Sequence, residues 1–143
     1  MNRRRAVVLA TATALLALSS ACTEEDRAKV EGVVSSATGA AASKMGEIKD
    51  GVDATGDVKA GPVKADGDRV ATEVTVSRPA GGDARTADYT VLVNFRDDGG
   101  GLLDSVVLSI DGVAPGASKN GTARSNRPLS GATKAEIGQA LRH

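Results

Sequence analysis

The 143-residue sequence predicts a mainly β protein: a small antiparallel β-sandwich preceded by an N-terminal signal and tether helix. Three observations predict this class. Apolar and polar residues alternate through the middle of the chain, which is the period of strands with one buried face. Clusters of Gly, Pro and Asp separate these stretches, and no helical pattern lies between them. The length allows one compact domain with an appendage, so a single sandwich is expected.

The first 22 residues have the pattern of an export signal. Arg3, Arg4 and Arg5 form a basic start, and residues 6–18 are an uncharged apolar run. The run is too short to span a membrane, because a transmembrane helix needs about 20 apolar residues. Small residues then lead to Cys22, the single cysteine of the chain. Residues 1–21 are therefore expected to be removed.

The stretch Leu18-Ser19-Ser20-Ala21-Cys22 resembles the lipobox of bacterial lipoproteins. The resemblance implies that an acyltransferase lipidates the Cys22 thiol and that a signal peptidase cuts between Ala21 and Cys22. Two or more acyl chains would hold the protein on the membrane, since each buried CH2 contributes about 0.8 kcal/mol. An ordinary cleaved secretory signal with a free thiol is the alternative. We expect an exported protein on the outer face of the cell membrane, delivered by the Sec or the twin-arginine route.

Residues 22–56 predict an Ala/Gly-rich helical tether, because apolar residues recur there at helical spacing. These residues are Val30, Val34, Ala37, Ala41, Met45, Ile48 and Val52. Three glycines at heptad spacing, Gly32, Gly39 and Gly46, each cost about 1 kcal/mol in a helix interior. A tether between lipid and domain is favoured over a seam for a partner helix, because leucine and isoleucine do not line the glycine seam.

Residues 57–143 predict the sandwich. Three long stretches each show one apolar face at period two, and turn residues separate them. The predicted inward residues are Val70, Thr72, Val74 and Val76, then Ala87, Tyr89, Val91, Val93 and Phe95, then Val106, Leu108 and Ile110. A first strand at residues 58–64 and weaker strands at 117–125 and 134–141 complete it. Residues 133–142 also fit a terminal helix, since Thr133 and Glu136 match a capping box.

The stretch of residues 89–116 carries a family resemblance. YTVLVNFRD from Tyr89, followed by a Gly turn, Leu102-Leu103 and VAPG from Val113, resembles the FxLYD-type immunoglobulin-like domains of bacterial surface lipoproteins. Arg96 departs from the pattern, because the family often has an aromatic residue or Leu there. The resemblance covers residues 57–142 and implies a small immunoglobulin-like sandwich without a catalytic centre.

Composition excludes several functional classes. Basic and acidic residues balance at 18 each and the chain has one Tyr and one Phe, so the charge and stacking surfaces for nucleic acid are missing. The single histidine, His143, and the single cysteine make neither a Ser-His-Asp arrangement nor a structural zinc site. We therefore expect a monomer with no enzymatic activity, no metal and no cofactor.

Two acidic pairs lie in glycine-containing turns. Asp66 with Asp68, and Asp97 with Asp98, could act as acid and base or bind calcium, but aspartate is expected in such turns for backbone reasons. We interpret both pairs as turn residues. A hydrolase that uses Asp97 or Asp98 is the weakest of the functional hypotheses.

Basic residues predominate after residue 111. The candidate contacts for an anionic partner, such as a lipid headgroup or wall polymer, are Lys119, Arg124, Arg127 and Lys134. Together these observations predict a membrane-anchored, non-enzymatic cell-envelope lipoprotein that acts as an interaction or accessory module for an envelope protein or wall polymer. The alternative is a lipidated or secreted small-ligand-binding protein of cystatin-like α+β architecture. In that alternative the tether helix packs across a sheet face at Leu92 and Val107.

Overall fold

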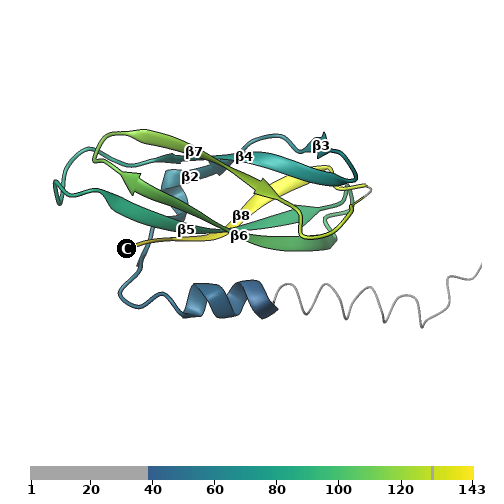
Figure 1. The fold of residues 1–143 in the computed structure, drawn as a ribbon, viewed down its shortest axis with the longest axis horizontal. Helices are drawn as coiled ribbons and strands as arrows, with labels where there is room; N and C mark the ends of the chain where they lie inside the picture. Colours follow the sequence, from purple (N-terminus) through teal and green to yellow (C-terminus); the bar gives the residue numbers. More distant parts are fainter. Residues whose placement is uncertain (1–38, 130) are drawn as a thin grey trace, which may run out of the picture.

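The computed structural model describes residues 39–129 and 131–143 (Figure 1). Residues 39–46 are helical, and short and long strands follow up to the C-terminus. The elements are β1 (Val52–Asp53), η1 (Thr55–Asp57), β2 (Val58–Ala60), β3 (Lys64–Asp66), β4 (Arg69–Ser77), β5 (Ala87–Arg96), β6 (Leu102–Val113), β7 (Ser118–Arg124) and β8 (Lys134–Arg142). The predicted signal and lipidation residues, Ala21 and Cys22 included, lie outside the described residues.

Two antiparallel sheets face each other, so the predicted mainly β sandwich is confirmed (Figure 1). The first sheet has the strand order β1-β8-β5-β6. In the second sheet β4 is central, and β7 pairs with it along residues 71–77. Because a strand has two edges, β2 and β3 lie end to end along the other edge of β4.

The core lies between the sheets on the faces that the alternation predicts. Val74 and Val76 of β4 and Tyr89, Val93 and Phe95 of β5 are fully buried. The β6 face follows the prediction less closely, since Ile110 is buried while Val106 and Leu108 are half-buried against the core.

The two sheets approach each other closely at Gly121 of β7. A Cβ atom there would lie 3.1 Å from carbon atoms of both Ile110 and Leu108. Glycine thus fits the close packing across the core, and a larger residue would force the side chains of Ile110 and Leu108 to shift.

The predicted strand at residues 58–64 is wrong in its extent, because the chain divides there into β2 and β3. Pro62 has no N–H to donate to the neighbouring strand, so the ladder is interrupted. Gly61 at the break donates its N–H to Glu73 O at 2.8 Å, and the Thr72 hydroxyl donates to Gly61 O at 2.7 Å.

The C-terminal segment is a strand, which decides between the two forms left open by the sequence. β8 runs between β1 and β5, and Ala140 near its C-terminal end is fully buried. The capping-box pattern at Thr133 and Glu136 therefore does not start a helix. Pairing along both edges of β8 outweighs this local preference.

The described part of the predicted tether helix ends earlier than expected. Residues 39–46 are helical, but Val52 belongs to β1, pairs with Arg142 and is 55% exposed. In the connection between this helix and β1, Asp50 has a positive φ of 63°. The first sheet thus begins at Val52, ahead of the domain boundary expected at residue 57.

The helical segment lies along the outer face of the sheet that contains β5, β6 and β8 (Figure 1). Ala41 and Met45, four residues apart on one helical face, are only 5% and 4% exposed. None of the helical segments within residues 39–129 and 131–143 has the length and apolar character of a membrane span.

Candidate functional site

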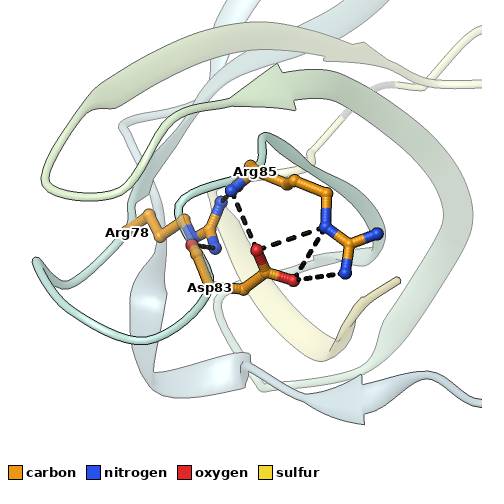
Figure 2. Close-up of polar contacts among 3 residues, drawn as sticks. All are labelled: Arg78, Asp83 and Arg85. Atoms are coloured by element: carbon orange, nitrogen blue, oxygen red, sulfur yellow. Dashed lines mark hydrogen bonds and ion pairs between the residues drawn. The ribbon is translucent and has the colours of Figure 1, made fainter.

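A buried arginine organises the end of the sandwich where β4 leads into β5. Arg78 is 7% exposed, and its Nη1 donates to the backbone oxygens of Arg85 at 2.7 Å and Val113 at 2.8 Å. Its Nη2 donates to Asp83 O at 3.0 Å (Figure 2). Because three carbonyl dipoles compensate the buried charge, Arg78 holds the loop of residues 79–86 against the end of β6.

Side-chain contacts within the loop fix it further. The carboxylate of Asp83 accepts a hydrogen bond from the Arg85 backbone N–H at 3.0 Å and forms an ion pair with the Arg85 guanidinium at 3.0 Å (Figure 2). The bond from the backbone N–H, followed by that from the side chain, lowers the pKa of Asp83 below its usual value of 3.8. Both side chains are exposed, so they shape the loop more than they stabilise the domain.

A cleft of about 410 Å³ opens beside this loop. Its wall includes Asp50, which precedes β1, Val52 of β1, Arg142 at the end of β8, and His143, which follows β8. Nε2 of His143 lies 3.1 Å from the Thr90 hydroxyl, and the backbone of His143 exchanges two hydrogen bonds with that of Asp88. The cleft can hold a small polar group. The side chains of Arg78 and His143 in its wall already form contacts within the domain, Arg78 with backbone oxygens and His143 with Thr90.

A second cleft, of about 430 Å³, separates the helical segment from β6. It is lined by Ala40, Ala41, Lys44, Ser105, Val106, Val107 and Asn126. Val107 is thus one of the residues facing the helix, as the α+β alternative expects. Leu92, opposite Val107 in the register of β5 and β6, is half-buried on the same sheet face.

A second buried charged residue is not among the site residues predicted from the sequence. Asp104 is fully buried, and its carboxylate accepts hydrogen bonds from the backbone N–H of Ser105 at 2.9 Å and of Asn126 at 2.7 Å. The same alternation that identifies the core also points to it. Extending the inward positions of β6 back from Val106 gives Asp104, and extending those of β4 forward gives Arg78.

The predicted contacts for an anionic partner are not brought together. Lys119 and Arg124 lie at opposite ends of β7, and Arg124 forms an ion pair with Asp66. Arg127 lies in the following loop, where its Nη2 donates to Leu103 O. Lys134 is exposed at the start of β8.

The acidic pairs take part in turns and surface contacts. Oδ1 of Asp97 accepts the Gly101 N–H at 2.7 Å and thereby closes the turn between β5 and β6. The other pair contributes Asp66 to the ion pair with Arg124. In the described ranges, His, Cys, Asp and Glu side chains do not form a group of three or more that could hold a metal ion.

The chain matches no known family model. Searches of curated proteins and of solved structures likewise give no match. The likeness to FxLYD-type domains therefore rests on the residues quoted for it alone.

Proposed function

We propose that the chain is a lipid-anchored, non-enzymatic protein on the outer face of the cell membrane, where its β-domain acts as an interaction or accessory module. The observation that carries the proposal is the stretch from Leu18 to Cys22, placed after a basic start and an apolar run of signal length. A single cysteine at that position is otherwise hard to explain in an exported protein.

The buried and loop polar side chains of the domain bind backbone atoms, which supports a structural rather than a catalytic role for them. Arg78, Asp83 and Asp97 hold loops through bonds to backbone atoms, and Asp104 ties β6 to the loop after β7. Such groups build a rigid surface on which a partner can dock. In this proposal the domain is related to the FxLYD-type immunoglobulin-like family, with an envelope protein or wall polymer as partner.

Detergent phase partitioning of the native protein beside the Cys22→Ser variant tests the anchor. We expect the wild type in the detergent phase and the variant in the aqueous phase, because the acyl chains supply the membrane affinity. Ser20→Ala is the matched control, since it changes a neighbouring small residue and leaves the thiol in place. A wild-type protein that partitions into the aqueous phase would refute the anchor.

One observation favours the second candidate, a small-ligand-binding protein. The helical segment buries Ala41 and Met45 and leaves a cleft of about 430 Å³ beside Val107. A small apolar ligand there would compete with the fluorescent probe anilinonaphthalene sulfonate. If this candidate holds, Val107→Trp should remove probe binding, whereas Val52→Trp on the exposed β1 should not.

A further inference from the structure

Along the free edge of β6, side-chain donors bind the backbone oxygens near both ends of the strand but not those between them. β6 is the last strand of its sheet and pairs with β5 along one edge. In an antiparallel strand the N–H and C=O of one residue point to the same side, and consecutive residues alternate between the two sides. The carbonyl oxygens of Leu103, Ser105 and Asp111 point away from β5, because each accepts a side-chain donor from outside the sheet.

These donors cap both ends of the edge. Arg127 Nη2 donates to Leu103 O, and Asn126 Nδ2 donates to Ser105 O at 3.0 Å. At the other end Lys119 Nζ donates to Asp111 O. Long open edges promote indiscriminate pairing between chains, and side chains that cover them suppress it. The caps therefore limit where another strand can add.

Between the caps, Val107 and Ser109 continue the alternation of Leu103, Ser105 and Asp111, so their backbone groups also point away from β5. Their backbone groups have no hydrogen-bond partner among residues 39–129 and 131–143. Ser109 is exposed and Val107 is half-buried. Two N–H and two C=O groups therefore point away from β5, which is the arrangement that accepts an added strand. On the inner side of this edge lies β7, whose Gly121 packs against Leu108 and Ile110.

The second cleft lies directly beside this opening. Val107 lines the cleft together with Ala40 and Ala41 of the helical segment, and the exposed Lys44 contributes a positive charge. Side chains of directly opposite residues lie on the same face of a sheet. A residue paired with Val107 would thus place its side chain in the cleft, between β6 and the helix.

We propose that residues 107–109 of β6 bind an extended segment of another protein as an added strand, with an apolar side chain in the cleft and acidic residues at the ends of the segment. Charge complementarity supports an acidic partner. Lys44 lines the cleft, and Lys119 and Arg127 lie at the two ends of the opening. In the described chain, Asp111 is the one acidic side chain among the exposed residues of β6. The inference deepens the proposed function, because it rests on the domain being an interaction module and names its docking surface.

A second copy of the chain fits this edge less well. In an antiparallel pair of β6 strands centred on Leu108, Asp111 of one copy would face Ser105 of the other. That register brings Lys119 of one copy near Arg127 of the other, and like charges repel. An acidic segment avoids this conflict.

Amide hydrogen exchange of the full-length protein in detergent tests the assignment. The probe is a short capped peptide of alternating valine and threonine with an aspartate at each end. We expect the peptide to slow exchange at Val107 and Ser109, while Leu108 remains as slow as before because its N–H points towards β5. Unchanged exchange at Val107 and Ser109 with saturating peptide would overturn the proposal.

Protein variants and altered peptides distinguish backbone hydrogen bonding from non-specific binding of the peptide. Ser109→Pro removes an N–H that no described residue uses and puts a ring in the path of the peptide, so it should abolish binding. The matched control Ser109→Ala keeps the N–H and should bind normally. N-methylation of the central peptide residues should abolish binding without any change to the protein, which covers the case of a proline variant that fails to fold. Equal binding of the methylated peptide would refute strand addition.

Charge and copy number are tested in the same system. Lys44→Glu should weaken binding by about fivefold and Lys44→Gln by less, because the first substitution also adds repulsion. A peptide with lysine at each end that binds as well as the acidic one would refute the assigned partner chemistry. Protection of Val107 that grows with protein concentration, in the absence of peptide, would assign the edge to a second copy instead. Intact mass of the same preparation reports lipidation, so a failure of the anchor and a failure of the docking surface are told apart.

Discussion

Replacing Phe95 by Ala should produce the largest loss of stability among single changes in the core. Phe95 is fully buried, and its register neighbours on the two adjacent strands are Asp104 and Ala135. Phe→Ala changes in cores cost about 3 to 5 kcal/mol, depending on how far the surroundings collapse. Two hydrogen-bonded neighbouring strands restrain that collapse, so we expect a value near the upper end. This is a large fraction of the roughly 5 to 15 kcal/mol that stabilises a domain.

Urea denaturation measures this loss, with the fluorescence of Tyr89 as a core probe because it is the single tyrosine of the chain. The midpoint should fall while the slope stays constant, since the same surface is exposed on unfolding. The matched control is Leu92→Ala, which shortens a half-buried side chain on the outer face of the same strand and should cost about 1 to 2 kcal/mol. A loss below about 1 kcal/mol for Phe95→Ala would refute the assignment of the inward face, because a buried aromatic ring cannot be removed at so small a cost.

Three further predictions concern other parts of the domain. Arg78→Met should destabilise the domain by about 2 to 4 kcal/mol, measured by urea denaturation, because three backbone oxygens lose their donor; an unchanged midpoint would contradict the role of Arg78. Gly121→Val should cost about 1 to 3 kcal/mol in thermal unfolding, since its Cβ would lie 3.1 Å from Ile110, and a neutral result would contradict the close approach of the sheets. Burial, with a smaller contribution from the nearby Asp57 carboxylate, raises the pKa of Tyr89, so its phenolate absorbance should titrate above pH 10. The corresponding stability is present below pH 10 and is lost as the pH rises through the folded-state pKa. Asp57→Asn should move the titration to lower pH, and a shift upward would refute the contribution of that charge.

Strand alternation predicted the core well because it depends on a property of each strand alone. Successive side chains point to opposite faces, so the burial of Val74, Val76, Tyr89 and Val93 follows directly from the period. The same period also reaches Arg78, but alternation alone does not show which groups compensate a charge at an inward position.

The hydrogen-bond partners of the buried charged residues could not be anticipated, because they are distant in the sequence. Arg78 is satisfied in part by Val113, at the far end of β6, and Asp104 by Asn126, beyond β7. Which distant backbone group meets a buried charge depends on the topology of both sheets. The sequence contains the position of each charge but not its partners.

The helical segment shows a similar limit. Spacing of apolar residues predicted a helix that includes Ala41 and Met45, and both are buried on one face. Its end before Val52 was missed, because the pairing of β1 with β8 competes with helix continuation. Docking on the sheet was expected only in the α+β alternative, through Leu92 and Val107.

The candidate contacts for an anionic partner rest on the excess of basic residues after residue 111, which does not bring them together in space. A strand separates its two ends by about 3.3 Å per residue, so Lys119 and Arg124 of β7 cannot form one cluster. In our proposal, Lys119 and Arg127 instead flank the opening in the edge of β6 and contribute positive charge on either side of it.

The lipid anchor at Cys22 is tested by the mass of the N-terminal fragment of the native protein. After limited proteolysis of protein purified from membranes, we expect a fragment that begins at Cys22 and carries the mass of two or more acyl chains. A fragment that begins at another residue, or one that begins at Cys22 with an unmodified thiol, would contradict the lipid anchor.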